Sequence, residues 1–212
     1  SQTIEYRDAS GCESEVSYER LILATGSQAK RPPIPGLAQY AFDIDQLESA
    51  RAFEQHLDSL VTRPSTPERN TVVVCGGGFT GIELATELPA RLRARFGTDT
   101  KTKVIVVERG KVIGGRYSEA LRSTIEAASN ELGVEWRLSS EIEAIDATGV
   151  TLKNGDRLPA ATVVWTAGVE ANPLSRQIDA ERDDLGRLKV TGTLQVPAHP
   201  DVFATGDMAH AR

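Results

Sequence analysis

The sequence of 212 residues predicts an α/β fold with a parallel β-sheet, a β-meander insertion and short β-rich flanks. Short apolar runs such as Val72–Val74 are typical of strands buried on both faces of a parallel sheet. Amphipathic segments with helical spacing lie between these runs. A stretch of closely spaced strand and turn signals, residues 134–155, predicts the meander.

The composition narrows the class of protein. The formal net charge of −6 and the lack of a basic run argue against nucleic acid as a partner. No stretch reaches the roughly 18 apolar residues of a membrane span, so we expect no membrane contact by this chain. Cys12 and Cys75 are too few and too far apart for a metal site or a disulfide framework. Cys75 lies in an apolar run and is expected to be a packed core residue.

The N-terminal part is predicted to form strands followed by a linker. Strands are expected at 3–8 and 15–24, on either side of a turn at Ser10-Gly11. The second strand ends in the apolar run 21–24. Three prolines within 28–36 exclude a helix there and indicate a stiff extended linker.

A helix is expected from about Asp45 to Leu60. The Asp45 carboxylate is a candidate N-cap, because it can accept a hydrogen bond from a free N–H of the first turn. Leu47, Phe53 and Leu57 recur at helical spacing, which predicts one apolar face. The polar, proline-containing segment 62–70 is expected to be a loop.

The middle of the chain alternates strands and helices. Strands are expected at 71–75 and 104–108, and a helix begins between them near Thr80. Because proline removes a helical hydrogen bond and clashes with the preceding turn, this helix is expected to kink or break at Pro89. A second helix is expected at 118–132, just before a terminating glycine. Its apolar stripe is Leu121, Ile125, Ala128 and Leu132.

Short strands and turns fill the rest of the chain. Strands are expected near 134–139, 141–147 and 149–153, and Asn154-Gly155 is a strong hairpin signal. One more buried strand is expected at 162–166. The segments LILATG, VVWTAG and VFATGD resemble one another, since each is an apolar strand that runs into a glycine.

A glycine-rich turn joins the strand at 71–75 to the helix. Strand, Gly-x-Gly-x-x-Gly and helix in this order are the fingerprint of a Rossmann-like dinucleotide-binding domain. Gly76 permits the tight turn, Gly78 lets backbone N–H groups approach a pyrophosphate, and Gly81 lets the helix pack close to the strand. The helix N-terminus adds partial positive charge. The predicted contacts are Gly76, Gly77, Gly78, Phe79, Thr80 and Gly81; the alternative is a purely structural turn.

Glu108 ends the next strand and is the candidate ribose ligand. A carboxylate there can accept hydrogen bonds from both adenine-ribose hydroxyls and would repel a 2′-phosphate, which favours NADH over NADPH. Arg109 is an opposing signal, because an arginine there can hold that phosphate. The spacing from Gly81 exceeds the usual value of about 20 residues, and the second helical piece and a polar loop account for the excess. The alternative for Glu108 is a solvated strand end.

Four segments carry a resemblance to a known family. They are RLILATGSQAKRPPIPG, VVVCGGGFTGIELATEL, VVWTAGVEANPL and PDVFATGDMAHA, in this order. Together they resemble the FAD-dependent pyridine nucleotide-disulfide oxidoreductases, flavoproteins with two dinucleotide-binding folds. The third segment is most similar to type II NADH dehydrogenases, the single-subunit NADH:quinone oxidoreductases. The resemblance runs over essentially the whole chain.

The resemblance implies further NADH contacts. Ala167 and Gly168 match the backbone that the family brings near the nicotinamide. Glu83 matches a glutamate near the nicotinamide ribose. Taken from the residues alone, Glu83 is also explained as an ordinary first-turn acid favoured by the helix dipole.

The resemblance also implies residues for FAD in a larger parent protein. Thr25 and Gly26 match the flavin-side junction, and Asp207 after Gly206 matches the aspartate beside the ribityl or pyrophosphate part of FAD. On composition alone, a plain strand-end turn is the alternative for each pair.

The domain organisation implied by the resemblance has three parts. Residues 1–35 are a flavin-domain segment and linker, 36–168 the NAD(H)-binding domain, and 169–212 a returning flavin-domain segment. The family begins with its own fingerprint for the ADP half of FAD and continues past the GD motif into a further domain. This chain has one fingerprint, so it looks like an NADH-binding domain excised from a flavoenzyme. We expect its two flanks to pair in a small antiparallel sheet.

The implied activity is that of an FAD-dependent NAD(P)H dehydrogenase. Hydride passes from C4 of NADH to N5 of FAD, and the electrons then go to a quinone or other acceptor through parts outside this chain. The cofactors carry this chemistry, so no catalytic side chain is expected, and His56, His199 and His210 are scattered. We expect NADH binding without turnover. The parent is expected to be cytoplasmic and peripheral on the membrane, and the resemblance allows a homodimer.

Several alternatives stay open. Within the enzyme class, the parent could be ferredoxin-reductase-like or NADH-oxidase-like. Outside the enzymes, the alternative interpretation is a non-enzymatic NAD-binding module. Such a module has no need of the ATG and GD segments, which face the flavin in the resembling family. A short-chain dehydrogenase is disfavoured, because no tyrosine is followed by lysine at the fourth position. Tyr6, Tyr18, Tyr40 and Tyr117 are followed there by Ser10, Ile22, Ile44 and Leu121.

Overall fold

The computed structural model describes residues 2–115 and 117–211, and their tertiary contacts divide the chain into two compact units. The larger unit is residues 29–168, and the smaller unit combines residues 1–28 with 169–212. The sequence predicted the first boundary after residue 35. The linker instead belongs to the larger unit, because Ile34 packs against its core and the Ile145 N–H donates to the Pro35 carbonyl at 2.9 Å.

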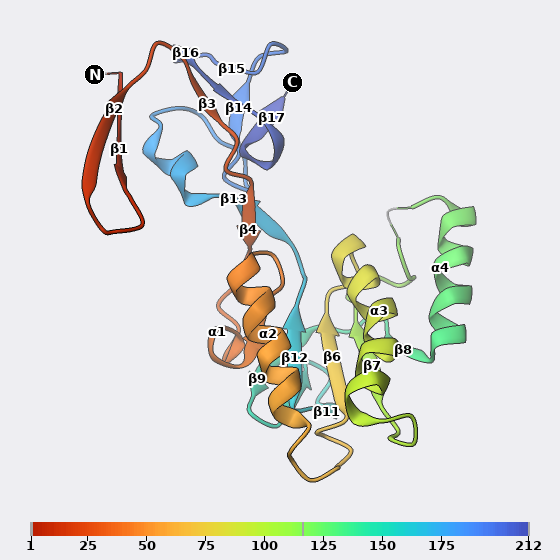
Figure 1. Cartoon of the computed structure of the whole chain (residues 1–212). Helices are drawn as coiled ribbons and strands as arrows, with labels where there is room; N and C mark the ends of the chain where they lie inside the picture. The colour runs from red at the N-terminus through yellow and green to blue at the C-terminus, as the bar shows by residue number, and fades with distance from the viewer. Residues whose placement is uncertain (1, 116, 212) are drawn as a thin grey trace. The chain divides into compact units, whose positions relative to one another are not determined.

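The larger unit is built on a five-stranded parallel sheet with strand order β5-β12-β6-β7-β8 (Figure 1). The strands are β5 (Ala41–Phe42), β6 (Thr71–Cys75), β7 (Lys103–Val107), β8 (Val134–Arg137) and β12 (Thr162–Trp165). From β6 the chain winds to β7 and β8 on one side, while β12 and β5 lie on the other. The predicted Rossmann-like α/β fold is therefore confirmed.

Both faces of this sheet are covered. On β6, Val72 and Val74 lie in a core with helices, and Val73 and Cys75 lie in a second core with the meander. The helices are α2 (Leu47–Leu60), α3 (Phe79–Phe96) and α4 (Glu119–Leu132), with a short α1 (Leu37–Tyr40) on the meander side. The meander is β9 (Ile142–Asp146), β10 (Gly149–Leu152) and β11 (Arg157–Pro159). Burial on both sides explains the continuous apolar runs of the strands.

Helix α2 starts later than predicted. Its N-cap is Gln46, which makes no side-chain capping bond, and the Asp45 carboxylate accepts a hydrogen bond from the Gln46 side-chain amide at 3.0 Å. Phe53 and Leu57 are buried as predicted, whereas Leu47, at the exposed first position, is 66% exposed.

The break predicted at Pro89 is wrong, because α3 runs from Phe79 to Phe96 as one helix. Pro89 is buried on the face that carries Leu88 and Leu92 into the core. Proline inside a helix costs about 3 kcal/mol, whereas each buried leucine contributes about 1.5–3 kcal/mol. Packing of this face therefore outweighs the local penalty.

Helix α4 has the predicted ends but a less buried stripe. The Ser118 hydroxyl accepts a hydrogen bond from the Leu121 N–H, and Gly133 ends the helix at φ +72°. Leu121 is exposed, and Ile125, Ala128 and Leu132 are half-buried. The predicted strand after α4 is β8 of the central sheet, and the predicted hairpin turn at Asn154-Gly155 joins β10 to β11.

The smaller unit holds short strands around a small core. The β1 (Thr3–Arg7) and β2 (Glu13–Ser17) hairpin is antiparallel, and β3 (Leu21–Leu23) is a separate strand rather than part of β2. Its sheets are β15-β16-β3, β14-β17 and β13-β4. The remaining elements are β4 (Ser27–Ala29), β13 (Val169–Ala171), η1 (Pro173–Gln177), β14 (Leu188–Val190), β15 (Gln195–Val196), β16 (His199–Ala204), η2 (Gly206–Met208) and β17 (Ala209–Ala211).

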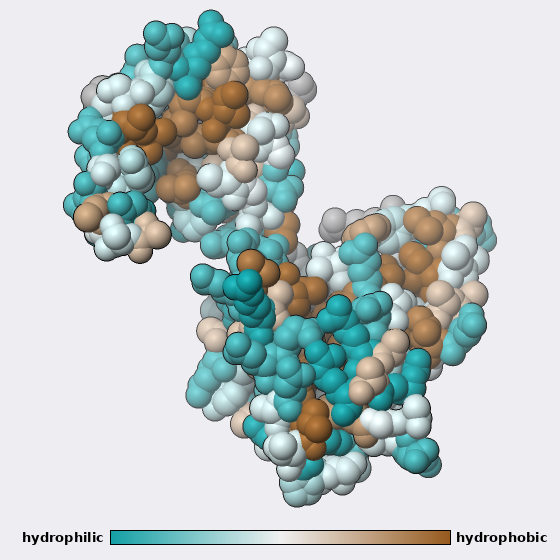
Figure 2. All heavy atoms as spheres, viewed as in Figure 1, coloured by the Kyte–Doolittle hydropathy of each residue, from teal (hydrophilic) through white to brown (hydrophobic). Residues whose placement is uncertain are grey.

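The two flanks pair in the smaller unit, but not as predicted. Strand β3 pairs with β16 in parallel, with Leu23 opposite Ala204. A parallel pair needs a long crossover connection, and residues between the two strands supply it. Apolar side chains are exposed on this unit (Figure 2), and Ile22 of β3 is 66% exposed.

Candidate nucleotide-binding site

The glycine turn and the segment Thr166–Gly168 lie side by side at one edge of the parallel sheet. Strands β6 and β12 are neighbours, with Cys75 opposite Trp165, so the segments that follow them leave the same carboxyl edge. The winding of the sheet reverses between these two strands. Ligands of open α/β sheets bind at such a switch point.

The fingerprint glycines meet different surroundings. Gly76 has φ +119°, and a Cβ built on it would lie 2.8 Å from the Ala167 Cα. A Cβ on Gly81 would lie 1.9 Å from the Gly76 carbonyl oxygen. Gly78 has φ −73°, and no atom lies within 4 Å of a Cβ built there. Gly76 and Gly81 are thus required by packing, whereas Gly78 leaves open space.

This open space lies at the N-terminus of α3. Gly78 is the N-cap of the helix and provides no side chain to bond the first-turn N–H groups. Phe79 and Thr80 are exposed. Free N–H donors and the positive end of the helix dipole suit an anion. We call this open space beside Gly78 and the first-turn N–H groups the pyrophosphate cradle. Any side chain at residue 78 would fill part of it, so the residues present fit a pyrophosphate.

Glu108 lies directly against the glycine turn. Its Oε2 accepts a hydrogen bond from the Gly77 N–H and its Oε1 accepts one from the Gly110 N–H, both at 2.7 Å. Each carboxylate oxygen keeps a further lone pair for a ligand hydroxyl. Arg109 is exposed. The pKa of Glu141 is lowered by its hydrogen bond from Lys153 and, more weakly, by the charge of Arg109.

Two side chains of this site were missed by the sequence analysis. The ring of Trp136 on β8 lies against the turn, since a Cβ on Gly77 would be 2.8 Å from it. The Thr166 hydroxyl donates to the Gly76 carbonyl oxygen at 2.9 Å. Trp136 lies on β8, the parallel neighbour of β7, which directly precedes Glu108. The sequence could have indicated its place near the turn only if the order of the strands had been known. Thr166 directly precedes Ala167 and Gly168.

The other residues predicted to contact NADH are Ala167, Gly168 and Glu83. Ala167 and Gly168 are exposed, and the Gly168 N–H donates to the Thr166 carbonyl at 3.0 Å. Glu83 is exposed on the first turns of α3. The structure thus brings Ala167 against Gly76 and Glu108 against Gly77, while Glu83 is an exposed residue of α3.

In the smaller unit, the ATG and GD segments also share one edge. Strands β3 and β16 are parallel neighbours, so Thr25-Gly26 and Gly206-Asp207 follow adjacent strand ends. The Ser27 hydroxyl donates to the Asp207 carboxylate at 2.9 Å. Gly26 and Gly206 have φ +69° and +60°, and no atom lies within 4 Å of a Cβ built on either. The two glycines leave open space at this edge, and Asp207 supplies a carboxylate there.

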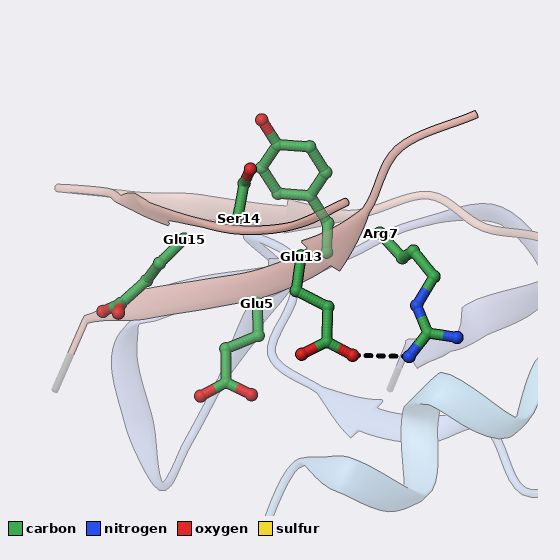
Figure 3. Close-up of a pocket in the computed structure, with 6 residues that line it drawn as sticks. Glu5, Arg7, Glu13, Ser14 and Glu15 are labelled. Carbon is green, nitrogen blue, oxygen red and sulfur yellow. Dashed lines mark hydrogen bonds and ion pairs between the residues drawn. The ribbon is translucent and has the colours of Figure 1, made fainter. Parts of the chain in front are cut away.

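A separate hollow lies on the β1–β2 hairpin and contains none of the predicted site residues (Figure 3). Arg7 and Glu13 form an ion pair there. Its lining is Glu5, Tyr6, Arg7, Glu13, Ser14 and Glu15. All six side chains are exposed, and we assign no binding role to this hollow.

Within residues 2–115 and 117–211, no group of three or more His, Cys, Asp or Glu side chains is placed to hold a metal ion. In the same part of the chain, no helix has the length and apolar character needed to cross a membrane. Cys75 is fully buried, and this burial raises the pKa of its thiol, as expected for a core residue.

Comparison with known proteins identifies the family. The family model of pyridine nucleotide-disulphide oxidoreductases matches residues 1–212. The chain belongs to this family. Membership confirms the resemblance that the four sequence segments indicated.

Relatives within the oxidoreductase family include an NADH dehydrogenase-like protein of Mycobacterium tuberculosis, 44% identical over 198 residues. The demethylphylloquinone reductase of Synechocystis is 33% identical over 205 residues. The alignments cover 92% and 95% of this chain, but 50% and 48% of the relatives. The chain therefore spans about half the length of the curated relatives it matches.

Solved structures of similar oxidoreductases share the fold. NDH2 of Plasmodium falciparum in complex with NADH matches with a TM-score of 0.84 at 18% identity, over 99% of this chain and 48% of that one. A ferredoxin reductase of Rhodopseudomonas palustris matches with a TM-score of 0.77 at 24% identity, over 96% of this chain and 46% of that one. At these identities the likeness shows the fold alone.

Proposed function

We propose that this chain is the NADH-binding part of an FAD-dependent NADH dehydrogenase that passes its electrons to a quinone. The observation that carries the proposal is the open cradle at Gly78, before the uncapped N-terminus of α3, with the Glu108 carboxylate bonded to the same turn. Family membership and the NADH dehydrogenase-like relative support it. The name of the Synechocystis relative, a demethylphylloquinone reductase, supports the quinone.

Each part of the site has a role in this proposal. The backbone of Gly76–Gly81 binds the pyrophosphate, and Glu108 accepts the adenine-ribose hydroxyls and repels a 2′-phosphate. Ala167 and Gly168 lie along the nicotinamide, and Glu83 lies near its ribose. Glu108 is the charge that selects NADH, while the exposed Arg109 beside it is the opposing charge.

The smaller unit contributes to the flavin site in the same proposal. Asp207, held by the Ser27 hydroxyl, and the backbone at Thr25, Gly26 and Gly206 border the FAD. FAD, when bound, supplies the redox chemistry by accepting hydride and passing electrons onward. The whole enzyme is proposed to be a homodimer attached to the cytoplasmic face of the membrane. Sedimentation and membrane fractionation test both points, and a monomer recovered only from the soluble fraction would contradict them.

Titration of the chain with NADH and NADPH, followed by nucleotide fluorescence, tests the binding proposal. We expect saturable binding that favours NADH. Gly78→Ser should weaken NADH binding about tenfold or more, an affinity change of about 1.4 kcal/mol, because the side chain enters the pyrophosphate cradle. Thermal stability should be kept, since serine is a favoured N-cap residue and residue 78 already has extended backbone geometry.

The matched control for Gly78→Ser is Gly192→Ser. Gly192 lies in the smaller unit, and no atom lies within 4 Å of a Cβ built on it. This variant should bind NADH like the wild type. The proposal fails if the wild type shows no saturable binding, or if folded Gly78→Ser binds NADH unchanged. A visible flavin band in the purified chain would contradict the expectation that it binds NADH without turnover.

A further inference from the structure

Thr166 connects the two segments of the proposed NADH site. Its N–H donates to the Cys75 carbonyl oxygen at 2.9 Å, just beyond the last paired residues of β6 and β12. Its hydroxyl donates to the Gly76 carbonyl oxygen at 2.9 Å and lies 3.2 Å from the Cys75 carbonyl oxygen. The bond from the Gly168 N–H to the Thr166 carbonyl then closes a tight turn. One side chain thus ties the loop after β12 to the glycine turn after β6.

The hydroxyl also lies between the first and third fingerprint glycines. A Cβ on Gly81 would be 2.8 Å from the Thr166 Oγ1, and a Cβ on Gly76 would be 2.8 Å from the Ala167 backbone. Both glycines therefore leave room for the loop after β12, in addition to allowing the helix to approach the strand. The position of this loop is set by contacts to the same turn that would hold the pyrophosphate.

We propose that Thr166 is a positioning residue for NADH, which deepens the proposed function and rests on it. Its hydroxyl fixes the separation between the pyrophosphate-binding turn and the Ala167-Gly168 backbone along which the nicotinamide half lies. Thr166 acts through Gly76 and Ala167 and does not itself touch the reacting atoms. Binding both halves of NADH at once requires these two segments to keep one separation.

Loss of the hydroxyl has a distinctive consequence. The turn alone still binds the ADP half, whereas the nicotinamide half also needs the loop. NADH should therefore lose more affinity than ADP-ribose, which lacks the nicotinamide ring. A purely structural role for Thr166 would lower the thermal stability and change both affinities by the same factor.

Isothermal titration of the full chain with NADH and with ADP-ribose tests this proposal. We expect Thr166→Ala to weaken NADH binding about tenfold and ADP-ribose binding by less than about threefold. Thr166→Ser keeps the hydroxyl and should restore both affinities. Thr166→Cys keeps an atom in place but donates weakly, so its NADH affinity should be intermediate. Thr124→Ala is the matched control, because the Thr124 hydroxyl donates to the Ala120 carbonyl within α4, outside the proposed site.

The outcomes separate this inference from the proposed function. Equal losses for both ligands, or no loss in folded Thr166→Ala, would overturn the role of Thr166. Wild-type affinity for NADH no higher than for ADP-ribose would also overturn it, because the nicotinamide would then make no contact. If Thr166→Ala does not unfold cooperatively, Thr166→Cys and Thr166→Ser give the same comparison. Failure of the wild type to bind either ligand contradicts the proposed function itself.

Discussion

At the residue scale, the glycine turn is shaped by contacts on three sides. The loop after β12 lies on Gly76, and Trp136 and Glu108 lie against Gly77. Gly78 alone faces open space. The turn is therefore fixed by the protein where it packs and is open at the place where a pyrophosphate would bind. Substitutions at the packed positions are therefore expected to lower the stability, whereas substitutions at Gly78 are expected to weaken nucleotide binding.

Glu108→Gln tests the ribose ligand. The amide group would face one of the two N–H donors that the carboxylate now accepts, so we expect a stability loss of about 1–3 kcal/mol. NADH affinity should fall about tenfold and the preference over NADPH should shrink, because the charge that repels a 2′-phosphate is gone. Nucleotide titration and thermal unfolding measure these effects.

Glu141→Gln is the matched control for Glu108→Gln. Glu141 is exposed and pairs with Lys153, so its loss should leave NADH affinity unchanged. Glu108→Arg should go further and improve NADPH binding at the expense of NADH. Unchanged NADH affinity in either Glu108 variant would show that this carboxylate is not on the ribose.

At the element scale, burial decides whether a helix follows the preferences of its local sequence. Helix α3 passes through Pro89 because its face is packed into the core around β6. Helix α4 is capped at Ser118 and Gly133, as its sequence predicts, although its apolar stripe is only half-buried. Helix α2 is joined to β12 by a polar contact, His56 Nε2 to Thr162 Oγ1 at 2.9 Å.

The His56 contact predicts a pH dependence of stability. Burial, and then the charge of Arg63, lower the pKa of His56 below its ordinary value of 6.5. The unfolded chain therefore takes up this proton first as the pH falls. The stabilisation is complete above about pH 6.5 and is lost as the pH falls through the lower folded-state pKa. We expect the Tm of the larger unit to fall as the pH drops below about 6.5.

Replacement of His56 tests this assignment. His56→Gln keeps a polar partner for Thr162 but cannot titrate, so the fall in Tm should be smaller. His199→Gln in the smaller unit is the control, because His199 contacts the Asp179 carbonyl and lies outside the larger unit. The assignment is wrong if His56→Gln and the wild type lose the same Tm over this range.

At the scale of the whole molecule, the two units differ in the size of their cores. The sheet of the larger unit is covered on both faces by separate apolar cores. Among the described residues, the smaller unit has one core, formed around Leu188, Val196 and Met208. Its parallel strand β3 exposes Ile22, although parallel strands are usually buried on both faces. We therefore expect the smaller unit to be the less stable one.

Differential scanning calorimetry tests this difference. We expect two transitions, with the smaller unit unfolding first. NADH at about 100 times its Kd should stabilise the larger unit by about 2.7 kcal/mol and leave the first transition in place. One transition that shifts as a whole with NADH would contradict the independence of the units. A Gly78→Ser sample provides the control without strong binding.

Much of the fold was predictable because its signals are local. The glycine fingerprint, the strand–turn–helix order, the Ser118 and Gly133 helix ends and the Asn154-Gly155 hairpin each depend on a few consecutive residues. The same is true of the apolar runs that became β6, β7 and β12. The family was also readable from short segments.

Only the tertiary structure decided the features that depend on distant residues. It determined the parallel pairing of β3 with β16, the attachment of the linker to the larger unit and the passage of α3 through Pro89. It also brought Trp136 and Thr166 to the glycine turn. The sequence by itself determined the local geometry, whose preferences amount to a few kcal/mol or less. The tertiary structure decided the rest, because burial summed over many side chains exceeds those preferences.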